Sequence, residues 1–352
     1  MATPVTRLES QVREQLQQIL EEVPFARLKG WKQEVQVRGG KIDLKLDLTV
    51  AKEQWRLLVE TKTIAEPRLI RGAIQQLQTY LSGLTKSYGV VASTYISPRA
   101  AEICKEAGIG YVDLAGNCRL VFGQVFIERQ GFPNPKIERR PLRTLFAPKA
   151  SRVLRVLLED VKQSWQVQAM ARQARVSLGL AFKVKQRLLD LEYARAEDEG
   201  LRLLRPEELL RQWAANYSYV KSNALDYFAI SDPPALEQAL SVYCRKQRIT
   251  YAFTLFSGAA RVAPFARYSR GCAFAVSEAS RLARELDWKP VLSGANFTIL
   301  TPYDEGLLYG ARQVNGDIVV SDVQLYLDLA SYKGRGEDAA AFILEQRLLP
   351  QW

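Results

Sequence analysis

Asp43, Glu60 and Lys62 are the residues of the N-terminal region whose types and spacing could do chemistry. Asp43 lies in segment 41–48, where apolar and polar residues alternate, and the other two lie in segment 56–62. Side chains two residues apart on a strand share a face, so Glu60 and Lys62 point the same way. Two carboxylates from adjacent strands could hold Mg²⁺ against a phosphate group, and the lysine could position or activate an attacking water.

The spacing of these residues resembles a known signature. The order Asp43, 16 intervening residues and a Glu-Thr-Lys run from Glu60 is similar to the PD-(D/E)xK nuclease signature. In the next predicted helix, Gln76 and Tyr80 resemble the Gln-Tyr addition of RecB-type members; they lie one helical turn apart and would face the same cleft. The resemblance implies a restriction-endonuclease-like α/β domain at residues 1–128, with Asp43 and Glu60 as Mg²⁺ ligands.

An alternative remains open for the two acids and the lysine. On half-buried strands, such residues are commonly ordinary solvated side chains of the polar face. Nuclease-like folds also serve as binding modules, because a fold does not establish a function. The sequence therefore predicts this fold more strongly than it predicts an activity.

Further elements should complete this domain. Residues 7–23 carry apolar side chains at spacings of three and four, which predict an amphipathic helix. A short strand is predicted at 88–92, a helix at 98–107 and a pair of strands at 109–126. The Gly-Asn pair that ends at Asn117 predicts a turn between these strands rather than a functional site.

The bulk composition restricts the classes of function. The chain has 352 residues, more than a single hydrophobic core usually supports, so three domains are expected. It contains no histidine, which excludes Ser-His-Asp hydrolases, HNH nucleases and His-ligated zinc enzymes. The formal net charge of +11 and the pI near 9.4 favour a polyanionic partner.

No segment predicts a membrane span or an export signal. The longest stretch without a charged residue, 290–303, has 14 residues, whereas a transmembrane helix needs about 20. The N-terminal segment becomes polar and charged at once. The four cysteines are far apart and form no CxxC pair, so reduced, mostly buried thiols and a cytoplasmic location are expected.

Residues 129–149 predict a basic linker. The segment holds four prolines and a glycine, which disfavour a helix or a central strand. Six basic residues oppose a single acid here, and Arg139, Arg140 and Arg143 lie among them, ahead of the next predicted domain. Two interpretations remain, an ordinary solvated run and a clamp for phosphate groups.

Residues 150–213 predict a winged helix-turn-helix. A helix capped by Ser151 is followed by a short helix at 167–174, a tight turn and a second helix at 178–191. Two strands joined by a turn would then form the wing, and Pro206 would start a further helix.

One face of the helix at 178–191 is the predicted DNA-reading surface. Its apolar stripe faces inward, so basic and polar residues lie on the opposite side and could reach phosphates or base edges in a major groove. The predicted contact residues are Ser177, Lys183, Lys185, Gln186 and Arg187. The alternative is a winged-helix module that serves protein contacts or dimerisation.

Residues 214–352 predict a C-terminal α/β domain. Apolar stretches alternate with helices, and an Asn-Gly pair at Asn315 predicts a two-residue hairpin turn. A Ser-Gly pair at Ser257 suggests a nucleotidyltransferase, but such enzymes need a close pair of aspartates on a following strand, and 271–276 contains no acid. We interpret the pair as a helix start or a close-packing turn.

The chain as a whole is similar to the AbiEi-type transcriptional regulators, the antitoxins of type IV toxin–antitoxin systems, in a long form with a nuclease-like N-terminal region. The likeness rests on the winged helix and on short motifs at 60–62, 110–117, 256–258, 325–329 and 334–337. The resemblance implies a protein that binds operator DNA, represses transcription without a required cofactor, and counters a toxin through its C-terminal unit.

Two hypotheses follow from these patterns. The first is a non-enzymatic regulator that binds double-stranded DNA with its winged helix and whose further partner would be a cognate toxin. The second is a Mg²⁺-dependent endonuclease that the winged helix targets to DNA and that cuts with Asp43, Glu60 and Lys62. The sequence favours the regulator, because nothing beyond this trio indicates catalysis.

Overall fold

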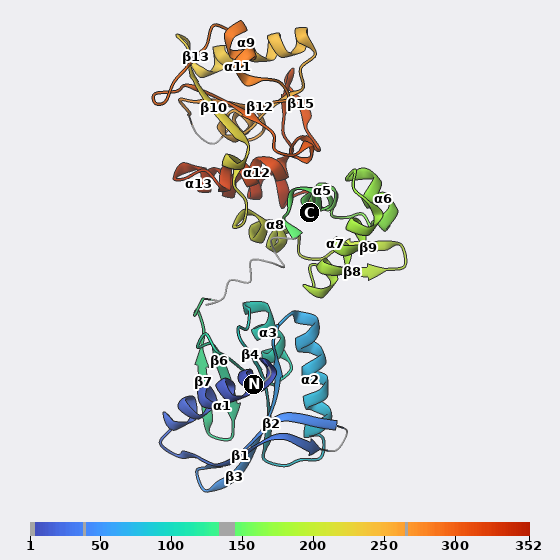
Figure 1. Cartoon of the computed structure of the whole chain (residues 1–352), viewed down its shortest axis with the longest axis vertical. Coiled ribbons are helices and arrows are strands. Elements are labelled where there is room, and N and C mark those ends of the chain that lie inside the picture. Colours follow the sequence, from blue (N-terminus) through green and yellow to red (C-terminus); the bar gives the residue numbers. More distant parts are fainter. Residues whose placement is uncertain (1–3, 38–39, 134–144, 265–266) are drawn as a thin grey trace. The chain divides into compact units, whose positions relative to one another are not determined.

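The computed structural model describes residues 4–37, 40–133, 145–264 and 267–352. The chain forms two compact units, residues 1–138 and 139–352, and each is a mixed α/β assembly with its own large sheet (Figure 1). Within the described ranges, no helix is both long enough and apolar enough to cross a bilayer. All four cysteines are buried and unpaired, as predicted.

The first unit is a seven-stranded sheet with helices on both faces. Its elements are α1 (Pro4–Glu21), β1 (Ala26–Val37), β2 (Gly40–Val50), β3 (Glu53–Lys62), α2 (Pro67–Leu81), β4 (Ser87–Ser93), α3 (Pro98–Glu106), β5 (Gly110–Asp113), β6 (Cys118–Phe122) and β7 (Val125–Arg129). The strands lie side by side in sequence order. The β3–β4 and β4–β5 pairs are parallel, and the other pairs are antiparallel.

Alternating side chains cover both faces of this sheet. Leu57 and Val59 of β3 pack in the core that includes α1, whereas Leu58 between them packs in the core that includes α2 and α3. Val90 and Val91 of β4 divide between the two cores in the same way. A strand that is covered on both faces needs apolar residues at consecutive positions, which explains the apolar runs in the sequence.

Two strands of this unit depart from the sequence prediction. The pattern does not predict β1, because β1 is an edge strand that pairs only with β2 and is mostly exposed or half-buried. The predicted pair of strands at 109–126 is three strands. Gly123 adopts a left-handed φ of 55°, which allows a second turn between β6 and β7.

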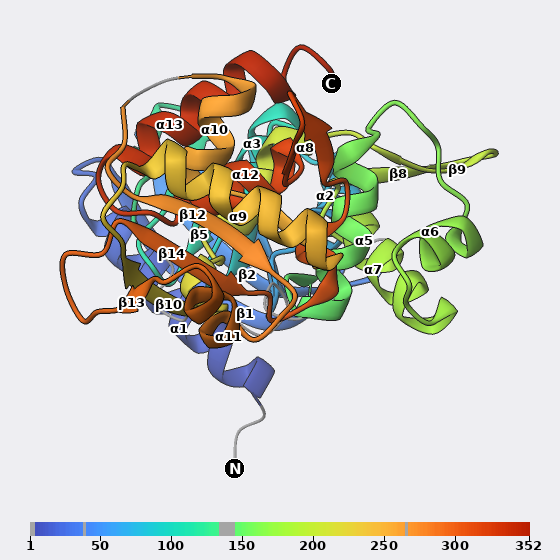
Figure 2. The ribbon, with the colours of Figure 1, turned by 90° about the horizontal axis from the view of Figure 1, so that it is seen from above.

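The second unit begins with three helices and a two-stranded ribbon. These are α5 (Pro148–Glu159), α6 (Val167–Gln173), α7 (Leu178–Asp190), β8 (Ala194–Glu197) and β9 (Gly200–Leu203). The ribbon extends away from the three helices (Figure 2), and Trp165 pairs with Leu201 beside it. This order of elements is the one expected of a winged helix-turn-helix.

The first of these helices starts one turn earlier than predicted. Pro148 occupies its first position, where the fixed φ of proline suits a helix and the missing N–H has no helical partner to lose. Ser151 therefore lies inside the helix rather than at its cap, and its hydroxyl donates to the Pro148 carbonyl at 2.8 Å.

The rest of the second unit is a second seven-stranded sheet with helices on both faces. Its elements are α8 (Pro206–Ala214), η1 (Tyr219–Lys221), β10 (Asn223–Phe228), α9 (Pro233–Gln247), β11 (Tyr251–Phe253), α10 (Leu255–Val262), β12 (Gly271–Ala275), α11 (Ala279–Glu285), β13 (Lys289–Pro290), β14 (Phe297–Thr301), η2 (Glu305–Leu308), β15 (Arg312–Val314), β16 (Asp317–Val319), α12 (Asp322–Ala330), α13 (Arg335–Ile343) and η3 (Leu344–Leu348). The strand order is β13-β10-β14-β12-β11-β16-β15.

Two cores sandwich this sheet. Phe253 and Phe297 pack toward α9 and α11, while Ala252 and Phe274 pack toward α10, α12 and α13. The second of these cores also contains the buried side chains of α5, α6 and α7. The predicted domains 150–213 and 214–352 therefore lie within one compact unit, where they share a hydrophobic core.

Candidate functional site

Asp43, Glu60 and Lys62 lie together where β2 and β3 meet. Lys62 Nζ is 3.1 Å from Glu60 Oε2. Asp43 Oδ2 accepts hydrogen bonds from the backbone N–H of Thr61 at 2.7 Å and from its hydroxyl at 2.9 Å. Glu60 is buried, and its pKa is raised by that burial and by the negative charge of Asp43. The three residues predicted from their spacing converge in space.

Glu9 of α1 joins this group, although the spacing analysis does not identify it. The side chain is buried, and its pKa is raised by burial and by the charge of Asp43. The sequence contains a signal for it. Glu9 lies three residues before Val12 and seven before Leu16, so this acid falls on the face of the helix that packs against the sheet.

Gln76 and Tyr80 lie in different surroundings from Asp43, Glu60 and Lys62. Tyr80 is buried, and its hydroxyl donates to the carbonyl of Lys41 at 3.4 Å. Gln76 is exposed on α2. No hydrogen bond joins either side chain to Asp43 or Glu60 in the described part of the chain.

A divalent cation at this position would depend on two carboxylates. No cluster of three or more acidic or cysteine side chains suited to a metal occurs among the residues the structure describes. Asp43 and Glu60 each use only one carboxylate oxygen in the hydrogen bonds of the described region, and a cation would relieve their mutual repulsion. These two residues therefore fit a Mg²⁺ ion that takes its other ligands from water or a phosphate.

The Asp-Leu-Ala-Gly-Asn segment after β5 is held by one buried carboxylate. Asp113 is fully buried, and its Oδ1 accepts the backbone N–H groups of Ala115, Gly116 and Asn117 at 2.8–2.9 Å. Its Oδ2 accepts the backbone N–H of Ile96 at 2.9 Å. All these bonds are internal to the fold, which agrees with the turn predicted here.

The helix α7 presents its N-terminal half to solvent. Ser177 is its N-cap, and the hydroxyl accepts the backbone N–H of Leu180 at 3.3 Å. Val184 packs inward in the shared core. Phe182 and Lys183 lie on the outer side of the helix, where the Phe182 side chain is 54% exposed. A large apolar residue is thus available for contact next to a cation.

Only part of the predicted contact set lies on this exposed face. Lys183 is exposed, but Lys185, Gln186 and Arg187 are half-buried. The Gln186 side chain also donates to Asp190 Oδ1 at 3.3 Å. These three residues are half-buried because the side chains at positions 184 and 188 point into the core. The residues next to them in the sequence therefore lie at the edge of the core.

Two arginines of the ribbon are candidates that the sequence analysis missed. Arg195 of β8 lies directly opposite Arg202 of β9, and both are exposed. Glu197 pairs with Arg195 at 2.7 Å. Directly opposed like charges destabilise a strand pair, so their presence favours an anionic partner. The signal was the two-residue period, since both arginines alternate with alanine or leucine.

The residues of the predicted phosphate clamp are only partly described. Arg139, Arg140 and Arg143 lie outside the described residues. Where the described chain resumes, α5 begins within the predicted linker, and Lys149 is exposed in its first turn.

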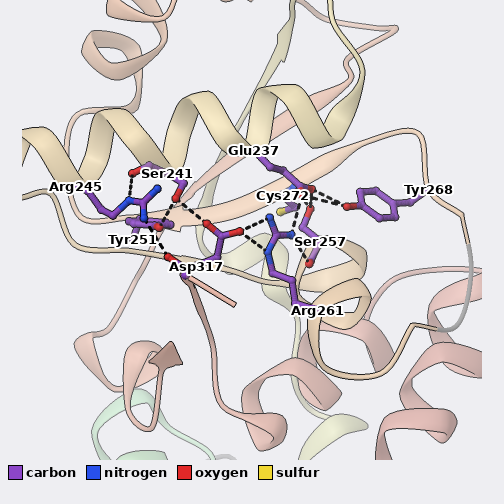
Figure 3. Close-up of polar contacts among 10 residues, drawn as sticks. Glu237, Ser241, Arg245, Tyr251, Ser257, Arg261, Tyr268, Cys272 and Asp317 are labelled. Atoms are coloured by element: carbon purple, nitrogen blue, oxygen red, sulfur yellow. Dashed lines mark hydrogen bonds and ion pairs between the residues drawn. The ribbon is translucent and has the colours of Figure 1, made fainter. Parts of the chain in front are cut away.

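A network of buried polar side chains lies behind the Ser-Gly pair at Ser257 (Figure 3). The Ser257 hydroxyl donates to Glu237 Oε1 at 2.5 Å and accepts the backbone N–H of Cys272 at 2.8 Å. Arg261 binds the same carboxylate at 2.7 Å and Asp317 at 2.8 Å. Each of these groups is satisfied by protein, which suits a structural role for the network.

The Ser-Gly pair itself lies in the first turn of α10, as the sequence interpretation expects. Ser257 is fully buried, and its hydroxyl donates one hydrogen bond and accepts another. A Cβ on Gly258 would lie 3.0 Å from the Phe253 carbonyl oxygen and 3.0 Å from a Leu325 methyl group. The glycine therefore permits close packing of α10 against its neighbours.

One known family matches the second unit. Residues 202–349 match the family described as transcriptional regulator, AbiEi antitoxin, type IV toxin–antitoxin system. The matched range runs from β9 to the end of the chain's last helices and includes the whole second sheet. No curated protein and no solved structure matches the chain. Residues 202–349 of this chain are thus similar to the AbiEi family of antitoxin transcriptional regulators.

Proposed function

We propose that this chain is a DNA-binding transcriptional regulator with an antitoxin role, and that α7 and the β8–β9 ribbon form its DNA-binding surface. The family match over residues 202–349, which begins within the second strand of the ribbon, supports a regulator. The order of three helices followed by a ribbon supports a winged helix-turn-helix.

The proposal rests on one observation, an exposed helix that lies beside a ribbon with two directly opposed arginines. Lys183 on α7 and the opposed Arg195 and Arg202 on the ribbon all face solvent. Guanidinium groups bind phosphate oxygens in a two-pronged geometry, and a helix in the major groove reads base edges. In this arrangement Phe182 would contact thymine methyl groups while Lys183 binds the backbone.

A gel-shift assay of the full chain tests this function. The probe is a duplex from the region upstream of its own coding sequence, compared with a random duplex of equal length at about 150 mM salt. We expect a clear preference for the upstream duplex and weaker binding by Lys183→Ala. The matched control is Lys246→Ala, which removes an exposed lysine from α9. Equal affinity for both duplexes, or equal losses in both variants, would overturn the proposal.

The convergence of three residues in the first unit supports a second candidate, a Mg²⁺-dependent endonuclease with a restriction-endonuclease-like domain. Asp43 and Glu60 would hold the cation, which polarises a phosphate when bound, and Lys62 would position water. Two observations support this candidate. Lys62 contacts Glu60, and burial and the negative charge of Asp43 raise the pKa of Glu60.

Plasmid cleavage in the presence of Mg²⁺ or Mn²⁺ tests this candidate. Asp43→Asn should abolish any nicking, because the amide removes a charge from the cation site. Asp47→Asn is the matched control, since Asp47 lies on the same polar side of β2 and pairs with Lys45 at 3.0 Å. Nicking that survives Asp43→Asn, or an intact plasmid with the unmodified chain, would reject the endonuclease.

A further inference from the structure

The second unit contains a cavity of about 800 Å³ that the proposed DNA-binding surface does not use. It lies over the ends of β10, β12 and β14, between α10 and the turn that joins α12 to α13. Buried Leu255 and Cys272 contribute to its lining. This volume is within the range of sites that enclose a small organic ligand.

Aromatic side chains form much of the cavity wall. They are Tyr219, Phe256, Tyr268 and Tyr332. The Tyr332 ring lies 6.1 Å from the Tyr219 ring in a stacked orientation and 5.4 Å from the Phe256 ring in an edge-on orientation. Burial raises the pKa of Tyr219 to about 12, so this phenol stays neutral at physiological pH. The wall therefore offers flat, uncharged surfaces on which a planar group can stack.

Basic side chains from two separate segments meet at the same cavity. Arg267 and Arg270 precede β12, whereas Lys333 and Arg335 flank the start of α13. Arg270 lies 3.5 Å from Asp226, the one acid among the described residues that line the cavity. Within the described ranges, the other three cations form no ion pair with the protein. Cations that gather without acidic partners favour an anionic ligand.

The start of α13 adds a further positive element. Gly334 is its N-cap residue, adopts a left-handed φ of 81° and supplies no side-chain cap. Gly334 and Arg335 both line the cavity. The N–H groups at the start of α13 thus lie at the cavity, where they can donate to an anion, although Glu337 and Asp338 in the first turn offset the helix dipole.

The buried polar network described above fixes one side of this cavity before any ligand binds. The Tyr268 hydroxyl lies 3.0 Å from Glu237 Oε1 and 3.1 Å from Oε2, and it donates to this carboxylate (Figure 3). Burial and the charge of Glu237 raise the pKa of Tyr268 to about 12. Glu237 is in turn held by Ser257 and Arg261. A prearranged wall lowers the entropy that is lost on binding.

We infer that this cavity binds a nucleotide, with the phosphate groups at the basic rim and the base against the aromatic wall. A phosphate requires cations and backbone N–H groups, and a base requires a flat apolar surface; the cavity provides both. The same chemistry is present in a free nucleotide and at the end of a single strand, so both are tested. The inference goes beyond the proposed DNA regulation, because the residues that line this cavity are not those of the proposed DNA-binding surface.

Isothermal titration calorimetry of the full chain, without duplex DNA, tests the inference. The probes are the four nucleoside monophosphates and triphosphates, the four nucleosides, inorganic phosphate and a single-stranded tetranucleotide. We expect nucleotides to bind more tightly than either nucleosides or phosphate alone. Tighter binding of the tetranucleotide would support the inference with a strand end as the source. Absence of binding by every nucleotide and by the tetranucleotide, or equal affinity for phosphate and nucleotide, would overturn it.

Two pairs of substitutions locate the ligand. Arg267→Ala with Lys333→Ala should weaken nucleotide binding at least about tenfold, because charge-assisted hydrogen bonds are lost. Lys246→Ala with Arg284→Ala removes the same charge from exposed positions on α9 and α11 and should leave affinity unchanged. Equal affinities in the two double variants would contradict the location.

The aromatic wall has its own test. Phe256→Leu keeps an apolar side chain in α10 but removes a flat ring from the cavity. We expect nucleotide affinity to fall about fivefold or more, while the affinity for inorganic phosphate stays unchanged. A parallel loss for both probes would show that the ring does not contact the base and would overturn the proposed orientation.

Discussion

The opposed arginines of the β8–β9 ribbon should affect DNA binding and protein stability in different directions. Arg195 and Arg202 lie across from each other. Hydrogen bonds from Ser164 and Arg195, together with the charges of both arginines, lower the pKa of Glu197. In the free protein, replacing both arginines by alanine removes a repulsion between like charges. The Arg195→Ala, Arg202→Ala variant should therefore keep the melting temperature of the unmodified chain or exceed it.

The loss in DNA binding can be estimated from counterion release. Each phosphate contact contributes about −0.9 to the slope of log affinity against log salt concentration, so two lost contacts reduce the slope by about 1.8. When the salt concentration rises fourfold, from about 50 to about 200 mM, the ratio of the affinity of the unmodified chain to that of the variant should fall by about twelvefold.

Fluorescence anisotropy with a labelled upstream duplex at several salt concentrations measures this slope. The Lys246→Ala, Arg284→Ala variant carries the same net charge as the ribbon variant, and it should retain the slope of the unmodified chain. Equal slopes in the two variants would refute the ribbon as a phosphate-binding element. A large drop in melting temperature in the ribbon variant would refute the stability argument.

Three further predictions concern the stability of the second unit. Burial raises the pKa of fully buried Asp328 from 3.8 to about 6, so the folded protein holds a proton that the unfolded chain releases. The free energy of unfolding should consequently fall by up to about 3 kcal/mol as pH rises from about 4 to about 6, and Asp328→Asn should remove this loss from urea titrations. Arg152→Ala leaves the half-buried carboxylate of Asp304 without the ion pair that joins them at 2.8 and 2.7 Å, and it should cost about 2 kcal/mol in urea titrations. Its control, Arg211→Ala in an exposed helical ion pair, should cost about 0.5 kcal/mol, and equal losses would contradict this reasoning. A Cβ on Gly200, where φ is 146°, would lie 2.5 Å from a backbone carbon of the segment paired with β9, so Gly200→Ala should lower both the melting temperature and duplex affinity.

The elements that the sequence predicts well are those set by nearby residues. The helix predicted at 98–107 is α3, which spans Pro98–Glu106 and has Ala107 as its C-cap. The hairpin turn has the predicted backbone, with φ of 49° at Asn315 and 91° at Gly316. Ser177, which directly precedes the helix predicted at 178–191, is the N-cap of α7. In each case, the information lies within a few residues of the feature.

Features that depend on distant parts of the chain could not be predicted in this way. The convergence of Asp43 with Glu60 follows from strand pairing, which spacing can suggest, but the approach of Glu9 depends on where α1 packs. The basic rim of the cavity joins Arg267 to Lys333, which are far apart in the sequence. No local pattern indicates that these cations share one ligand-sized space.

The helix α5 belongs both to the proposed DNA-binding part and to the core of the α/β part. Its Arg155 is fully buried and donates to Gln324 of α12, while its Arg152 holds Asp304 beside η2. The indole N–H of Trp352, at the end of the chain, donates to the carbonyl of Leu158 at 3.1 Å. Separating α5 from these three elements would leave buried charges unpaired, so a hinge at this boundary is strongly disfavoured. A partner that displaces α12 or η2 must therefore also displace α5 and the helices α6 and α7 that pack on it. In the proposed regulator, a protein contact at α12 or η2 would thereby alter the proposed DNA-binding surface.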